Sequence, residues 1–156
     1  KRQILVASND LQSLYVANNV CSAVEYFRKL GGNVGVAGLV INKDDGSGEA
    51  AAFAETVKIP ILASIPQDDD LRKKSANYHI VGTKESQWGD LFAELGTNTA
   101  EAPPLRPKPL DQDGLLNLFA ASETGADFVL QPATDADMRG KFAKPKESLE
   151  VVYDEV

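Results

Sequence analysis

Two polar segments, each directly after an apolar run, hold the residue types best suited to binding a ligand. Asn42 and Lys43 follow the run GLVI, and Pro66, Gln67 and Asp68 follow the run ILASI. The Asn42 amide can donate and accept hydrogen bonds at once, which suits the donor–acceptor edge of adenine. The more common alternative is an asparagine that ends a strand and caps a turn, and the pattern alone permits both interpretations.

The segment after Ile65 offers a second candidate surface. Pro66 fixes the direction in which the chain leaves the apolar run, and a helix that opens there would present free N–H groups. Asp68, Asp69 and Asp70 would repel phosphate, so we expect this segment to border a base or a ribose. The alternative is an acidic first helical turn that the helix dipole stabilises. A metal site is only weakly indicated, because neighbouring residues of a helix point apart.

The other chemistry-bearing residues indicate neither a catalytic centre nor a metal site. Cys21, the one cysteine, falls on a predicted apolar helix stripe and is expected in the core. His79, the one histidine, is expected on the surface, so no Ser-His-Asp triad or histidine metal site can be assembled. One cysteine cannot hold an iron–sulfur cluster alone. The phosphate-binding motifs GxxxxGKS, GxxxxGKT and, after a strand, GxGxxG do not occur, so these residues lack the machinery to hydrolyse a nucleotide.

Length and composition limit the function classes. With 156 residues, 43% hydrophobic and 25% charged, the chain can bury the core of about one domain. The net charge of −7 argues against binding to nucleic acid or to an anionic membrane surface, and no apolar run could span a bilayer. A lone cysteine fits a reducing compartment, so we expect a cytoplasmic location. The chain begins on a predicted strand without Met, which suggests a truncated piece of a longer protein.

The apolar periodicity predicts strands that alternate with helices. The expected strands are 3–7, 33–42 and 59–66, and the expected helices are 11–30, 49–57, 67–77 and 85–95. This order implies parallel crossover connections, so the expected fold class is α/β, a parallel sheet with helices on both faces. Trp88, Leu91, Phe92 and Leu95 recur at helical spacing and are expected in the core. Three strands make a thin sheet, which again suggests an absent portion.

The composition changes at residue 98. Four of the eight prolines fall within 98–114, which predicts an extended linker outside the core. A short helical pattern around 115–121, a possible strand at 127–132 and a charged tail follow. We therefore divide the chain into a domain at 1–97 and a proline-rich linker with a C-terminal extension at 98–156.

Several segments together resemble a known family. LVASNDLQSLYVANNVCSAVEYFRKLGGNVGVAGLVINKDD, IPILASIPQDDDLRKKSANY and the tail with APPLRPKPL and LEVVYDEV are similar to the nitrogenase iron-protein-like ATPases, in particular the iron-protein subunits of chlorophyllide a reductases. The resemblance runs nearly end to end, but it covers only the C-terminal half of the family's P-loop NTPase fold. In full-length members, the P-loop and two cysteines per subunit precede the point that matches Lys1. Cys21 matches neither cluster ligand, and Asp10 matches an acidic position near the dimer interface.

The resemblance assigns roles to the two polar segments. Asn42 falls where the family's strand-final asparagine contacts adenine, and Lys43 occupies the adjacent nucleotide-contacting position. Pro66, Gln67 and Asp68 match the loop that flanks the base. Many relatives have a basic residue where this chain has Gln67. The resemblance thus implies a base site at Asn42, Lys43 and Pro66 to Asp68, with no catalytic residue and no metal ligand in this chain.

The implied activity is that of a gated electron donor. ATP with Mg²⁺ would bind at the interface of a homodimer that holds one [4Fe–4S] cluster. Electrons received from a donor such as ferredoxin would pass to catalytic partner subunits that reduce the C7=C8 bond of a chlorin, in bacteriochlorophyll biosynthesis. Dark-operative protochlorophyllide reductase is the nearest alternative, although its iron protein usually carries Asn-Arg at both Asn18-Asn19 and Asn42-Lys43. A partitioning-type ATPase would not explain the proline-rich tail, and a non-catalytic α/β interaction module is the alternative from another class.

Overall fold

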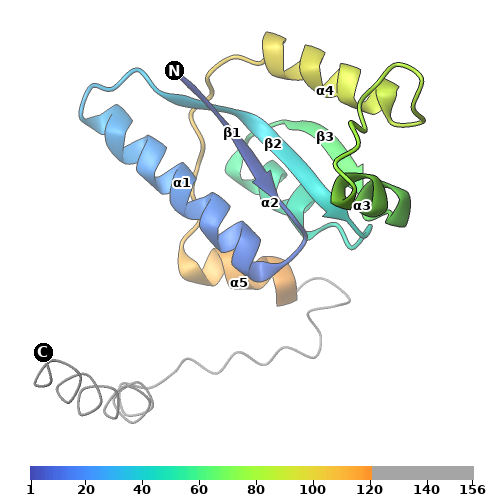
Figure 1. Cartoon of the computed structure of the whole chain (residues 1–156). Coiled ribbons are helices and arrows are strands. Elements are labelled where there is room, and N and C mark those ends of the chain that lie inside the picture. The colour runs from blue at the N-terminus through green and yellow to red at the C-terminus, as the bar shows by residue number, and fades with distance from the viewer. Residues whose placement is uncertain (121–156) are drawn as a thin grey trace, which may run out of the picture.

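The computed structural model describes residues 1–120 and has an α/β fold, as the alternation of strands and helices predicted. Strands β1 (Arg2–Ala7), β2 (Gly35–Asp44) and β3 (Ile61–Pro66) form one parallel sheet in the order β1-β2-β3 (Figure 1). Apolar residues make up most of these segments, and β2 is buried over most of its length, as a central parallel strand should be. The predicted strand at 127–132 and the charged tail lie outside the described residues.

Five described helices surround the sheet, and four of them were expected nearly where they occur. They are α1 (Leu11–Lys29), α2 (Glu49–Val57), α3 (Asp69–Ala76), α4 (Gly89–Glu101) and α5 (Gln112–Ala120). Helix α4 differs most from its expected range of 85–95. Residues before Gly89 form successive turns, because the Ser86 hydroxyl group donates to the Val81 carbonyl and accepts from the Trp88 amide. No described helix is long and apolar enough to cross a membrane.

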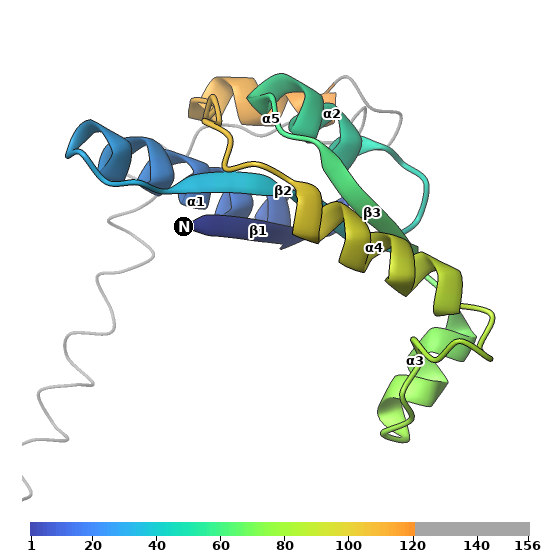
Figure 2. The ribbon, with the colours of Figure 1, turned by 90° about the horizontal axis from the view of Figure 1, so that it is seen from above.

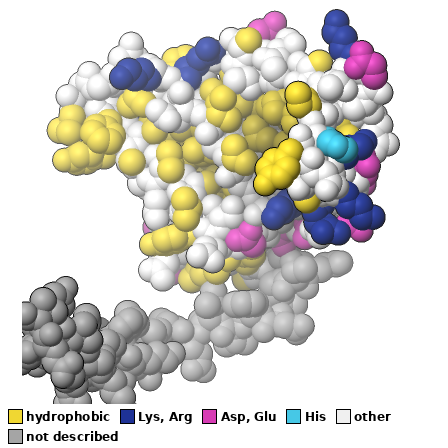
Figure 3. Space-filling model, viewed as in Figure 1, with side chains coloured by type: hydrophobic (Ala, Val, Ile, Leu, Met, Phe, Trp, Pro, Cys, Tyr) yellow, Lys and Arg dark blue, Asp and Glu magenta, His cyan; other side chains and the backbone are white. Residues whose placement is uncertain are grey.

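The helices cover both faces of the sheet, although unequally (Figure 2). On one face, α1, α2 and α5 enclose the main core, which includes Leu5, Leu14, Cys21, Leu39, Phe53 and Leu115. On the other face, α4 covers a smaller cluster of Ala37, Val40, Leu62 and Ala102. The outer face of β1 stays open, because Ile4 is 44% and Val6 is 62% exposed. Figure 3 shows hydrophobic side chains across the part of the surface where β1 and α1 lie.

The expectation that residues 98–114 form a linker outside the core is wrong for two residues, since Ala102 and Pro107 are buried. The prolines hold this segment extended, and two of its N–H groups bind the start of β2 and the end of α2. Leu105 exchanges two backbone hydrogen bonds of 2.9 Å with Val36, and the Lys108 amide donates to the Val57 carbonyl. Helix α4 also continues across the change in composition at residue 97. The division into 1–97 and 98–156 stays a prediction.

A buried asparagine fastens this extended segment, which we call the strap (residues 102–111), to α1. The Asn18 carboxamide donates to the Leu110 carbonyl and accepts from the Leu110 amide, both at 2.8 Å. Arg106 adds an exposed ion pair with Glu25, and its guanidinium group lowers the pKa of that carboxyl group. The strap therefore connects α4 on one face of the sheet to α5 on the other.

Candidate functional site

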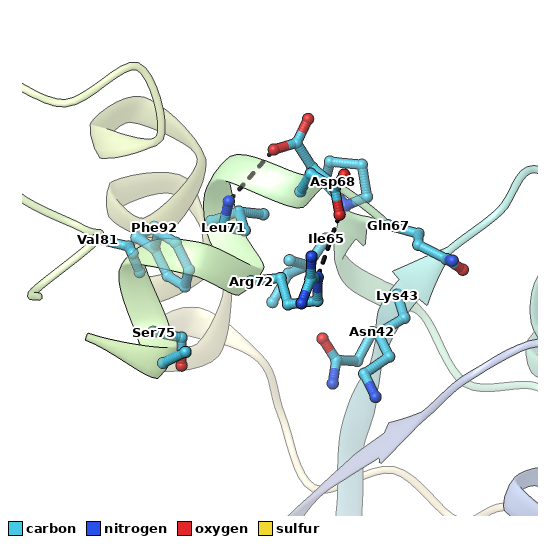
Figure 4. Close-up of a pocket in the computed structure, with 13 residues that line it drawn as sticks. Asn42, Lys43, Ile65, Gln67, Asp68, Leu71, Arg72, Ser75, Val81 and Phe92 are labelled. Carbon is cyan, nitrogen blue, oxygen red and sulfur yellow. Dashed lines mark hydrogen bonds and ion pairs between the residues drawn. The ribbon is translucent and has the colours of Figure 1, made fainter. Parts of the chain in front are cut away.

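The ends of β2 and β3 bring together the two polar segments that the sequence singled out. Asn42 pairs with Ile65, and Asp44 pairs with Pro66, so the carboxyl ends of these strands lie side by side. Asn42, Lys43, Pro66, Gln67 and Asp68 all line one pocket of about 870 Å³ (Figure 4). The carboxyl edge of an open parallel sheet is where ligands of α/β proteins usually bind. That these residues bind a nucleotide stays a prediction.

Helix α3 and the segment after it supply pocket residues that sequence reasoning missed. They are Leu71, Arg72, Ser75, Ala76, Val81 and Phe92, and Asp69 also lines the pocket, in the segment that was expected to border a base or a ribose. Positions 68, 71, 72 and 75 share one face of a helix, so helical spacing continued from Asp68 would have found part of this wall. Val81 and Phe92 carried no such signal, because only the course of the α3–α4 connection and the packing of α4 on β3 bring them to the pocket.

Asn42 presents an available amide to the pocket. Its side chain is half-buried, and its carboxamide forms no hydrogen bond with a described residue. A half-buried amide normally has a partner, because desolvating it without one costs free energy. The apolar side chains of Ile65, Leu71, Val81 and Phe92 form much of the surrounding wall. This combination suits a flat apolar ring with a polar edge, such as a nucleotide base.

Lys43 adopts an unusual backbone conformation at the pocket rim. Its φ is 53°, and the pairing of β2 with β3 shifts in register between Asn42 and Asp44. The extra residue bends the end of the strand, and such irregularities often re-aim side chains beside functional sites. The ammonium group is exposed and pairs with no carboxylate among the described residues. Lys43 is therefore available to an anionic part of a ligand.

A hydrogen-bond network behind the pocket fixes the ends of all three strands. The Asp44 carboxylate accepts from Asn9 Nδ2 at 2.9 Å, from the Gly46 amide at 3.0 Å and from the Ser64 hydroxyl group. The Ser64 hydrogen bond is the main cause that lowers the pKa of Asp44. Asn9 Oδ1 in turn accepts from the Ala50 amide at the start of α2. The network holds the β2 end, and with it Asn42 and Lys43, in place.

Asp10 lies at the same edge of the sheet but does not line the pocket. It caps α1, because its Oδ1 accepts from the Ser13 amide at 2.7 Å. Its Oδ2 accepts from the Ser8 hydroxyl group, and this is the main cause that lowers its pKa. In the described structure, residues 8–10 therefore connect β1 to α1 and cap the helix. Any contribution of Asp10 to a dimer interface stays a prediction.

The three consecutive aspartates each hold part of the structure around α3. Asp68 caps the helix, because its Oδ1 accepts from the amides of Asp70 and Leu71 at 2.7 and 3.2 Å. Asp69 forms an ion pair with Arg72 at 3.1 Å. Asp70 pairs with Lys74 and accepts from the side-chain Nε2 of Gln87 and the Trp88 indole, contacts that lower its pKa, with Lys74 as the largest cause. The carboxylates do not converge, and no group that could hold a metal ion occurs in residues 1–120.

The other residues that the sequence analysis named differ in how deeply they are buried. Cys21 is fully buried, as expected, and burial raises the pKa of its thiol to about 11. His79 is exposed, as expected. Trp88 is only half-buried, as are Leu91, Phe92 and Leu95. Leu95 packs against the smaller core cluster, as expected. None of the four is fully buried, because α4 packs mainly on β3 and Trp88 instead binds Asp70 on α3.

Comparison with known proteins decides the family. The family model described as 4Fe-4S iron sulfur cluster binding proteins, NifH/frxC family, matches residues 1–124. The chain belongs to the NifH/frxC family. The α/β fold of the described residues is thus part of a NifH-family P-loop NTPase domain, as the resemblance implied.

Within the NifH/frxC family, the chain is similar to chlorophyllide reductase chains and to protochlorophyllide reductase components. It is 72% identical to the chlorophyllide reductase 35.5 kDa chain of Cereibacter sphaeroides, covering 99% of this chain and 46% of that protein. It is 65% identical to the same-named chain of Rhodobacter capsulatus, and the match covers 100% of this chain and 47% of that protein. A light-independent protochlorophyllide reductase iron-sulfur ATP-binding protein of Rhodopseudomonas palustris (strain BisA53) is 32% identical. This match covers 76% of this chain and 40% of that protein. The chain therefore spans about half the length of these relatives.

Proposed function

We propose that this chain is part of the ATP-dependent electron-donor subunit of a chlorophyllide a reductase, an oxidoreductase component of bacteriochlorophyll biosynthesis. The observation that carries the proposal is the 72% and 65% identity to chlorophyllide reductase chains over nearly all of its residues. Identity to a protochlorophyllide reductase component is 32% over a shorter stretch, which makes that alternative less favoured. The non-catalytic interaction module loses support because the chain belongs to an iron–sulfur family.

The contribution of this chain is to bind the nucleotide base. Asn42 reads the edge of adenine, the apolar wall excludes water from the ring, and Lys43 attracts the anionic part of the nucleotide. Pro66, Gln67 and Asp68 flank the base, and Asp68 does so while it caps α3. The support is geometric, because the five residues line one pocket with an available amide and an apolar wall. These residues would hold the base of ATP with Mg²⁺, whose binding would favour a closed, docking-competent form of the dimer.

The [4Fe–4S] cluster takes its ligands from the remaining portion of the subunit, with this chain as the C-terminal half. A cluster ligand must be a thiolate, whereas Cys21 is buried among apolar side chains that raise the pKa of its thiol. Cys21 therefore does not fit the role of a ligand. The subunit acts as a homodimer in the cytoplasm, receives electrons from a donor such as ferredoxin and passes them to catalytic subunits that reduce the chlorin C7=C8 bond.

The first test is the intact mass and iron content of the natively expressed protein, purified without oxygen. We expect a mass of about twice that of this chain, because the chain covers 46% of a relative. We also expect about four iron atoms per dimer, as one [4Fe–4S] cluster requires. A protein with the mass of this chain and no iron would contradict the proposal, and the reductase activity would then belong to another polypeptide.

A further inference from the structure

Arg72 is the one arginine among the residues that line the pocket, and its surroundings leave most of its donors available. Its Nε donates to Asp69 Oδ1 at 3.1 Å, and no other contact of its guanidinium group with a described residue is present. Both side chains of this pair are largely exposed, at 70% and 77%, so the pair adds little to folding. Figure 4 shows Arg72 on the side of α3 that faces Asn42 at the end of β2.

The charges around Arg72 distinguish it from Lys43. Asp68, Asp69 and Asp70 make the start of α3 acidic, and Asp69 already compensates the Arg72 charge. A phosphate group would be repelled there, whereas Lys43 pairs with no described carboxylate. A guanidinium plane that keeps its charge partner can still stack on an aromatic ring, which an ammonium group cannot do. The geometry therefore suits a base at Arg72 better than a phosphate.

We propose that Arg72 is a base-binding residue of this pocket, whose guanidinium plane stacks on the nucleotide base while Asn42 reads the base edge. The Nε contact with Asp69 orients the plane, and Leu71 beside it extends the apolar wall. The base is then held by α3 and by the end of β2 at once. This inference deepens the proposed function and rests on it, because it requires that the pocket binds a nucleotide.

The test compares variants of the complete subunit in calorimetric titrations with the ATP analogue AMP-PNP and with inorganic tripolyphosphate, which has no base. We expect Arg72→Ala and Arg72→Lys each to bind AMP-PNP about tenfold more weakly, since a desolvated cation–π contact is lost or reduced. Binding of tripolyphosphate should not change. Lys73→Ala is the matched control, because Lys73 is exposed on the same helix, carries the same charge and does not line the pocket.

Each result that differs from the expected one contradicts either the role of Arg72 or the proposed function. If Arg72→Lys binds AMP-PNP like the wild type, charge rather than stacking acts at this position and the inference is wrong. Equal losses for AMP-PNP and tripolyphosphate would assign Arg72 to phosphate instead, and an unchanged Arg72→Ala would remove it from the site. A wild-type subunit that binds no AMP-PNP would contradict the proposed function itself. Unchanged thermal midpoints, expected for so exposed a side chain, show that the variants are folded.

Discussion

At the scale of single residues, the pocket depends on side chains that the protein leaves available. Asn42 has donors and an acceptor without described partners, whereas Asp68, Asp69 and Asp70 are all engaged around α3. An engaged carboxylate mainly shapes the site, and an available amide can discriminate between ligands. The two polar segments therefore contain residues of two kinds: the aspartates hold the structure of the pocket, and Asn42 is available to bind a ligand.

This division predicts the behaviour of Asn42→Ala in the complete subunit. The substitution should weaken ATP binding about threefold to tenfold relative to GTP, because a net hydrogen bond to the adenine edge is lost. GTP presents a different edge and should lose less. Competition titrations with both nucleotides measure the ratio, and the thermal midpoint checks the fold. Equal losses for ATP and GTP, or a collapsed protein, would exclude Asn42 as the base reader.

At the scale of elements, the strap is bound to α1, β2 and α2, whereas its proline-rich sequence indicated a linker outside the core. Asn18 lies in the middle of α1, is only 6% exposed and bonds both backbone polar groups of Leu110. Its removal leaves a part-buried N–H and a part-buried C=O of Leu110 without their partner, which is costlier than the loss of an exposed contact. The strap and α5 should therefore loosen together if this clamp is removed.

We predict that Asn18→Ala lowers the free energy of unfolding by about 2 kcal/mol. Asn19→Ala is the matched control, because Asn19 is the next residue of the same helix and is exposed. It should change the free energy by less than about 0.5 kcal/mol. Chemical denaturation of the two variants measures both values. Similar values for both would show that the clamp does not stabilise the protein.

The network at the strand ends predicts a pH dependence. The folded-state pKa of Asp44 is lowered, chiefly by the Ser64 hydroxyl group and then by the Gly46 amide. Its stabilising contribution is therefore fully present above the unfolded-state pKa, near 3.8, and is lost as the pH falls through the lower folded-state value. In Asp44→Asn, the loss of stability below about pH 4 should be shallower. Denaturation midpoints at pH 7 and across the acid range provide the measurement, and an unchanged acid slope would contradict the assignment.

At the scale of the whole molecule, one large apolar surface is uncovered in the described chain. It combines the outer face of the edge strand β1, with Ile4 and Val6, and a stripe formed by Val16 and Phe27 of α1 and by Leu30 just after this helix. The last three side chains are 56%, 56% and 67% exposed. Parallel strands are normally buried on both faces, and an open apolar edge promotes association.

We therefore predict that the 156-residue chain, expressed alone, associates in a concentration-dependent manner. The double substitution Val6→Lys and Phe27→Lys should shift it toward the monomer, because charge opposes burial of this surface. Tyr78→Lys is the control, since Tyr78 is 96% exposed but lies outside this surface. Sedimentation velocity over a concentration series measures the shift. A chain that stays monomeric throughout would show that the surface does not drive association.

The sequence alone determined the elements, the edge where the pocket lies and the family. Apolar periodicity acts over short windows, so the strands and most helices followed from it, and parallel strands necessarily place Asn42 and Pro66 at one edge. Only the tertiary structure brought Val81 and Phe92 to the pocket and buried Pro107. These outcomes depend on packing between distant segments. The Asn18 contact with Leu110, for example, joins residues 92 positions apart, and no local pattern encodes such a pairing.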